Sequence, residues 1–168
     1  MEAVAPVSGE SQPPAVVVGV DGSASSKEAL RWAVAEARLR KAPLRALHAW
    51  IYLHALVPPL VGYPYTREIG PAALDTAAAG QQGAEAILDQ ALATVGDLDD
   101  IEITRLIVQD SPAQALIDAV FAQDLLVVGS RGHGGFAGLL LGSVSQQCAQ
   151  HAPCPVVIVR AGRQTERT

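Results

Sequence analysis

Short β-branched runs alternate along the chain with longer segments in which apolar residues recur at helical spacing. The apolar runs cover 15–20, 44–50, 101–108, 125–128 and 155–159. Because they are rich in Val, Leu and Ile, such runs are typical of strands buried on both faces of a parallel sheet. The segments between them predict helices from the serines at 25 and 26 to about 41, at 72–95, at 112–123 and at 143–151.

Capping residues and prolines mark where several of these helices begin and end. Ser25 or Ser26 is expected to cap the first helix, which Pro43 ends, and Ser111 precedes a proline suited to a first helical turn. By contrast, residues 51–71 contain four prolines and all three tyrosines of the chain. We expect a long loop there, of a kind that often serves as a lid or a binding element.

The alternation of strands and helices predicts an α/β fold with a five-stranded parallel doubly wound sheet in the order 3-2-1-4-5. In such a sheet, a ligand binds outside the carboxyl ends of the strands, where the winding direction reverses. That point lies between the first strand, ending at Gly19-Val20-Asp21, and the fourth, ending at Gly129. We expect one domain over 15–161, flanked by a disordered tail at 1–14 and a polar tail at 162–168.

Charge and composition narrow the possible functions. The chain is 49% hydrophobic and 4% aromatic, with a net charge of -5, which argues against a general nucleic-acid binder. However, residues 125–165 contain no acidic residue and include three arginines. This part of the chain could therefore bind an anion. No apolar run reaches the roughly 18 residues that a membrane span needs, and no signal pattern is evident, so a cytoplasmic location is expected.

The two cysteines, Cys148 and Cys154, are expected to be buried or half-buried reduced thiols. Neither CxxC spacing nor a paired HxxxH occurs, so no metal site is predicted. No catalytic constellation is predicted either, because no paired carboxylates and no nucleophile beside a base present themselves.

The glycine-rich segment from Gly129 to Ser143 carries the clearest chemical signal. Glycines permit positive φ and let a backbone approach a phosphate, and successive N–H groups form an anion nest. Gly142 and Ser143 open a helix, whose free N–H groups favour the same anion. The segment lacks the lysine of a P-loop, and its chance GxGxxA match lacks the acid that a dinucleotide site needs about 20 residues on.

The spacing Gly129, two residues, Gly132, nine residues, Gly142-Ser143 is the G-x2-G-x9-G-[ST] signature. With VVGVDGS at 17–23, LHA at 47–49 and CPVVIV at 154–159, the chain resembles the ATP-binding universal stress proteins from Val16 to Arg160. The resemblance implies an adenine nucleotide alpha-hydrolase-like fold. It also implies a homodimer formed through the last strand, whose apolar edge invites pairing.

The resemblance also implies roles for individual residues. Asp21 would lie near the nucleotide, the backbone of Ala49 would contact adenine, and Gly19 would lie close to the base. Loop glycines would hold ribose and phosphates. The full set of candidate contacts is Gly19, Asp21, Ala49, Val128, Gly129, Ser130, Arg131, Gly132, His133, Gly134, Gly135, Gly142, Ser143 and Val144.

Some candidates have simpler alternatives. Arg131 and His133 are included because a cation suits a phosphate, and a solvated surface position explains them equally well. Asp21 also suits a strand-end turn. His48 is expected to be a satisfied histidine at the edge of the core.

The function expected from these observations is binding of ATP with Mg²⁺ by a stress-response or signalling protein, not by a dedicated enzyme. Slow ATP hydrolysis and a module that binds AMP or cyclic AMP remain open alternatives. A nucleotidyl-transferring enzyme is disfavoured, because such enzymes carry a HIGH-type motif where this chain has Asp21-Gly22-Ser23-Ala24.

Overall fold

The computed structural model describes residues 13–51, 71–132 and 140–162. In chain order the elements are β1 (Val16–Gly19), α1 (Ala24–Arg40), β2 (Leu44–Trp50), α2 (Pro71–Ala93), β3 (Ile103–Gln109), α3 (Pro112–Asp118), β4 (Leu125–Gly129), α4 (Ser143–His151) and β5 (Val156–Val159).

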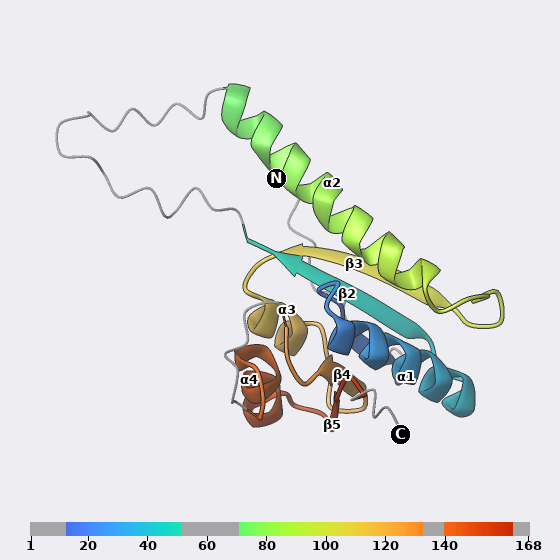
Figure 1. Ribbon diagram of the computed structural model, residues 1–168. Coiled ribbons are helices and arrows are strands. Elements are labelled where there is room, and N and C mark those ends of the chain that lie inside the picture. Colours follow the sequence, from blue (N-terminus) through green and yellow to red (C-terminus); the bar gives the residue numbers. More distant parts are fainter. Residues whose placement is uncertain (1–12, 52–70, 133–139, 163–168) are drawn as a thin grey trace, which may run out of the picture.

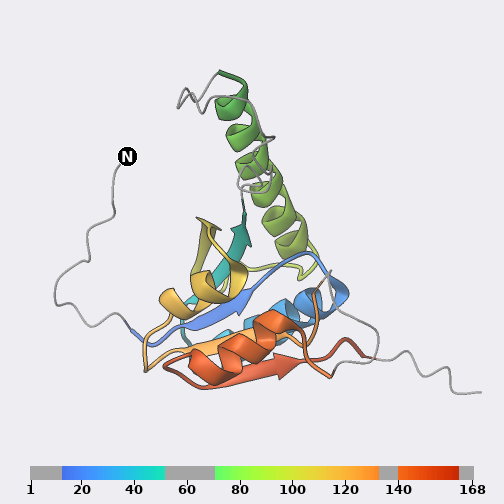
Figure 2. The same cartoon turned by 90° about the vertical axis from the view of Figure 1, so that its left-hand side faces the viewer.

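The strands form a parallel five-stranded sheet in the order β3-β2-β1-β4-β5, as the alternating pattern predicted. Helices α1 and α2 cover one face, and α3 and α4 cover the other, so the sheet is the middle of three layers (Figures 1 and 2). The central strand β1 pairs with β2 on one side and with β4 on the other. Its residues Val16, Val17 and Val18 are completely buried, which is why this strand is apolar on both faces.

Helix α2 lies along β2 and β3, and its amino-terminal part extends beyond the rest of the molecule (Figure 1). The ring of Trp50, at the end of β2, packs against this helix at Gly80. A Cβ at Gly80 would come within 2.6 Å of a Trp50 ring atom. Nothing lies within 4 Å of a Cβ added at Gly83. One of the two helical glycines therefore makes room for a ring, and the other does not.

Asp124 connects several segments at the amino-terminal side of the sheet through its carboxylate. Its buried carboxylate accepts hydrogen bonds from the Ala15 N–H at 2.8 Å and the Phe121 N–H at 2.9 Å. Arg45 of β2 lies 3.4 Å from the same carboxylate. Because Asp124 captures the Phe121 N–H, the chain turns after Ala119, and α3 ends several residues before the predicted 123.

The first helix also starts differently from the prediction. Ser23 is its N-cap, and the Ser23 hydroxyl accepts a hydrogen bond from the Ser26 N–H at 3.2 Å. Ser25 and Ser26 lie inside the first turn and are buried. The preceding Gly22 has φ of 83°, a left-handed turn conformation that glycine adopts without strain.

Candidate functional site

A cavity of about 240 Å³ opens at the carboxyl ends of β1, β2 and β4. This is the switch point predicted from the strand order. The predicted contact residues that line it are Gly19, Asp21, Ala49, Val128, Gly129, Arg131, Gly132, Gly142, Ser143 and Val144. The fold thus brings together the ends of β1 and β2 and the segment from β4 to α4, although Gly19 and Val144 are more than a hundred residues apart in the sequence.

One end of the cavity is apolar. The last paired residues of β1 and β2 are Gly19 and Leu47, so β2 continues past β1, and Ala49 lies at the open end. The Leu116 side chain of α3 packs against Gly19, and a Cβ added at Gly19 would come within 2.9 Å of it. The missing side chain of Gly19 therefore lets an apolar wall close over the strand end, leaving a slot suited to a flat ring.

The other end is rich in backbone donors. Helix α4 begins at Ser143 with Gly142 as its N-cap, and the first backbone bond into its first turn runs from Gln146 N–H to the Gly142 carbonyl. The N–H groups of Ser143 and Val144 precede that bond, and both residues line the cavity. A helix start of this kind favours an anion.

The base of the glycine-rich loop is closed by Ser130. Its carbonyl accepts the Gly142 N–H at 2.8 Å, and its own N–H donates to the Val159 carbonyl at 2.7 Å. Ser130 is buried and does not line the cavity. This predicted contact residue therefore lies behind the cavity and connects the loop with β5.

Gly129 and Gly132 need their missing side chains for reasons other than a positive φ. Neither is among the described glycines with positive φ, which are Gly22 and Gly96. A Cβ on Gly129 would lie 2.8 Å from the Ser25 carbonyl carbon, so this glycine lets α1 approach β4. A Cβ on Gly132 would lie 2.6 Å from a carboxylate oxygen of Asp21.

Asp21 is held in a turn at the mouth of the cavity. One of its carboxylate oxygens accepts the Ser23 N–H at 2.9 Å, and its own N–H donates to the Ser26 hydroxyl at 3.3 Å. The turn role foreseen for Asp21 is thus confirmed, and the other carboxylate oxygen lies beside Gly132. Within the described part of the chain, Asp21 is the acid that lines the cavity.

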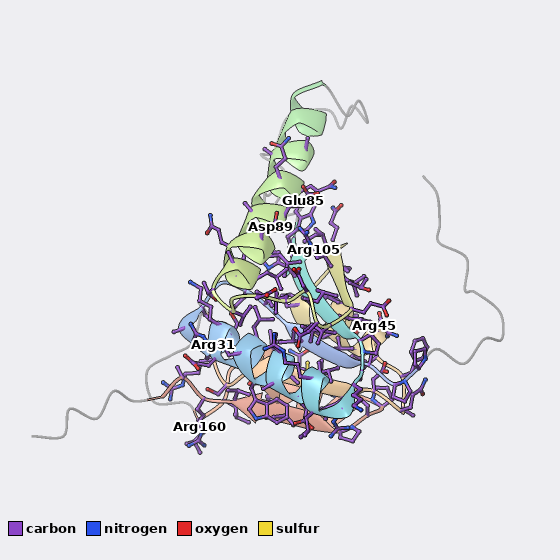
Figure 3. All side chains as sticks on the ribbon, turned by 90° about the vertical axis from the view of Figure 1, so that its right-hand side faces the viewer. Arg31, Arg45, Glu85, Asp89, Arg105 and Arg160 are labelled. Atoms are coloured by element: carbon purple, nitrogen blue, oxygen red, sulfur yellow. The ribbon has the colours of Figure 1, made fainter. Side chains whose placement is uncertain are left out.

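Cations also lie near this edge. Arg131 lines the cavity and is exposed. Arg160 directly follows β5, and Figure 3 places it on the opposite side of the molecule from Arg45, which lies near the amino end of β2. Across residues 13–51, 71–132 and 140–162, no group of three His, Cys, Asp or Glu side chains is arranged to hold a metal ion.

The remaining predicted residues are His133, Gly134, Gly135 and His48. His133, Gly134 and Gly135 lie outside the described residues. His48 is buried, and its Nδ1 lies 2.6 Å from the Val20 carbonyl, which confirms the prediction of a satisfied histidine at the core.

Both cysteines are free and buried, as expected. Burial raises the pKa of Cys148 to about 11, with the nearby Cys154 adding to the shift.

The sequence reasoning missed several residues that line the cavity. These are Val20, Ser26, Leu47, Pro112, Leu116 and Ser145. Leu47 belongs to the LHA motif at 47–49, and Ser145 follows the last serine of the signature by two positions. Both could therefore have been predicted from the sequence. Pro112 and Leu116 gave no local signal, because α3 reaches the cavity only through the packing of the fold.

The strand order and the helices on both faces define a doubly wound α/β fold. The model of the universal stress protein family matches residues 14–160. The chain therefore belongs to the universal stress protein family. None of the helices in the described part of the chain is long and apolar enough to cross a membrane.

Curated relatives support the assignment. Universal stress protein Rv2623 of Mycobacterium tuberculosis is 38% identical over 145 residues, which are 86% of this chain and 44% of that protein. A Thermus aquaticus universal stress protein is 34% identical over 147 residues, which are 86% of this chain and 97% of that protein. The chain spans about half the length of the first curated relatives that it matches.

Solved structures show the same architecture. UspA from Lactobacillus plantarum matches with a TM-score of 0.68 at 21% identity. The match covers 90% of this chain and 100% of the UspA chain. A universal stress protein solved in complex with cAMP is 30% identical, with a TM-score of 0.54. That match covers 89% of this chain and 98% of the solved one.

Proposed function

We propose that this protein binds an adenine nucleotide, with ATP and its Mg²⁺ as the leading candidate, in the cavity at the carboxyl ends of β1, β2 and β4. The observation that carries the proposal is the division of the cavity. An apolar slot at Ala49 and Leu116 suits a base, and the helix start at Gly142 and Ser143 suits phosphate.

The described residues fit a nucleotide-bound magnesium ion better than a separate metal site. Mg²⁺ is commonly held by one or two carboxylates together with substrate phosphates. Asp21 lines the cavity beside Gly132 of the loop and has a carboxylate oxygen on that side. We therefore assign Asp21 as the protein group that would contact the ion, whose charge would offset that of the phosphates.

AMP or cyclic AMP is the alternative ligand. The similar structure at 30% identity was solved with cAMP, which favours a ligand with a single phosphate. The exposed guanidinium of Arg131 suits either a single phosphate or the outer phosphates of ATP.

Calorimetric titration of the purified protein with ATP, ADP, AMP and cyclic AMP, with and without Mg²⁺, tests the proposal. We expect micromolar affinity, roughly -7 to -8 kcal/mol, for at least one of them. Mass spectrometry of the nucleotide released from freshly purified protein identifies the natural ligand. Absence of heat and of a thermal shift with all four compounds would refute nucleotide binding.

We propose that the nucleotide acts as a regulatory ligand of a cytoplasmic stress-response or signalling protein. The described cavity holds a single carboxylate and no nucleophile beside a base, which supports a binding role over a dedicated enzymatic one. A phosphate-release assay with ATP separates the two, because sustained turnover on the scale of seconds would contradict a purely regulatory role.

We also propose a homodimer formed through β5. This strand is an edge of the sheet, and its side chains are half-buried. The Pro155 carbonyl accepts a hydrogen bond from Leu126 of β4, and the Val159 carbonyl accepts one from Ser130 directly after β4. The alternation of the strand therefore turns the N–H groups of Val156 and Ile158 outward. Antiparallel pairing with a second copy would satisfy them.

A proline at position 158 tests this interface. Ile158→Pro removes an outward N–H, whereas the control Ile158→Ala removes the side chain and keeps the N–H. Light scattering should give a dimer for the wild type and the alanine variant, and a monomer for the proline variant. A wild-type monomer at micromolar concentration would contradict the proposed dimer.

A further inference from the structure

Two buried serines lie on either side of the base of the glycine-rich loop. Ser145 belongs to the first turn of α4 and is 1% exposed. Its hydroxyl lies 3.2 Å from the Ser130 carbonyl and 3.0 Å from the Gly142 carbonyl. The hydroxyl thus bridges the residue where the described loop begins and the residue where it ends, beside their own backbone hydrogen bond.

Ser25 approaches the same region from α1. Its hydroxyl donates to the Arg131 carbonyl, and the Arg131 N–H lies 3.4 Å from the same oxygen. Ser25 is buried although it occupies the first turn of a helix. The absence of a side chain at Gly129 is what allows this approach.

We propose that Ser25 and Ser145 are positioning residues that hold Ser130, Arg131 and Gly142 in the arrangement that receives the phosphate. This inference rests on the proposed nucleotide-binding function and adds two residues outside the signature. Ser25 does not line the cavity, and the Ser145 hydroxyl is engaged by two backbone carbonyls. Both are therefore expected to act through the loop backbone rather than through contact with the ligand.

The physical reason is the conformational entropy of the backbone. A phosphate that must itself fix the backbone of Ser130, Arg131 and Gly142 on binding would bind more weakly. Hydrogen bonds that fix the two ends of the loop before the ligand arrives reduce that cost. Each bond of this kind contributes on the order of 1 kcal/mol, equivalent to about a fivefold change in affinity.

Binding of ATP, AMP and adenosine to the full chain separates positioning from a general structural role. Ser25→Ala and Ser145→Ala are each expected to weaken ATP and AMP binding about five- to tenfold, and to leave adenosine binding within about twofold. Adenosine has the base and the ribose but lacks the phosphate that the fixed ends of the loop would receive, so it is expected to be less sensitive to these two substitutions. Ser111→Ala is the matched control, because Ser111 is exposed and its side chain makes no cap hydrogen bond. This variant should bind all three compounds like the wild type.

Thermal unfolding of each variant shows whether it is folded. If Ser145→Ala does not fold, Ser25→Ala carries the test alone. Equal weakening of all three compounds, or unchanged nucleotide affinity in Ser25→Ala, would overturn the positioning role while leaving the proposed function intact. A wild-type protein that binds none of the three compounds would refute both.

Discussion

Replacing Gly129 with alanine is expected to destabilise the whole domain. The added Cβ would lie 2.7 Å from the Ser25 hydroxyl, 2.8 Å from the Ser25 carbonyl carbon and 2.9 Å from the Ser26 nitrogen. Two of these three atoms belong to the backbone of α1, which cannot rotate away as a side chain can. The helix start and the end of β4 must therefore separate.

The size of the effect follows from these distances. Carbon atoms of packed side chains lie about 3.5 to 4.0 Å apart at their optimum, so the helix start must move by more than half an ångström. Overpacking of this kind costs about 1 to 3 kcal/mol. For a domain of this size, that corresponds to a Tm lower by roughly 3 to 10 °C.

Gly142→Ala is the matched control, since it places the same methyl group in the same loop. Gly142 has φ of -78°, which alanine adopts freely, and its added Cβ would come no closer than 3.4 Å to any neighbouring atom. This variant should change the unfolding free energy by less than about 1 kcal/mol, because alanine is a poorer N-cap than glycine but reduces the freedom of the unfolded chain. Urea unfolding followed by circular dichroism measures both. Equal stability of Gly129→Ala and the wild type would refute the argument from α1.

The remaining predictions concern α2 and the buried thiols. Gly80→Ala should lower the unfolding free energy by about 1 to 3 kcal/mol, because its methyl group meets the Trp50 ring, whereas Gly83→Ala should raise it by up to about 1 kcal/mol. Urea unfolding measures both, and equal effects of the two would contradict the packing at Trp50. The raised pKa of Cys148 predicts that stability is fully present below pH 9 and is lost by about 2 to 3 kcal/mol as the pH rises to about 11, because the unfolded thiol ionises first. Unfolding across this range should show a smaller loss in Cys148→Ala, and an identical loss would rule out this thiol as the source.

Much of the fold could be predicted because its signals are local. Each strand lies in a short run rich in apolar residues, and each crossover contains helical spacing, so the strand order follows from the rules of parallel sheets. Because the fourth strand ends at Gly129, this order placed the glycine-rich loop at the switch point. The structure brings these residues together with Gly19 and Ala49 around one cavity.

The parts that could not be predicted depend on contacts between distant segments. Position 129 must be glycine because α1 lies too close to the end of β4 to leave room for a side chain. Nothing in the sequence of the loop shows where α1 lies. Leu116 reaches the cavity because α3 packs over Gly19. Likewise, α3 ends early because a carboxylate beyond the helix, that of Asp124, captures the Phe121 N–H.

The hydrogen bond between Asp124 and the Ala15 N–H sets a limit for engineering the amino end of the domain. A shortened chain that starts at Ala15 keeps a nitrogen atom at that place, now as an ammonium group facing the buried carboxylate. A chain that starts at Val16 loses the donor and leaves the carboxylate short of one partner, which costs about 1 to 3 kcal/mol. Affinity tags, fused domains and protease sites therefore belong upstream of Pro14, where they leave this junction untouched.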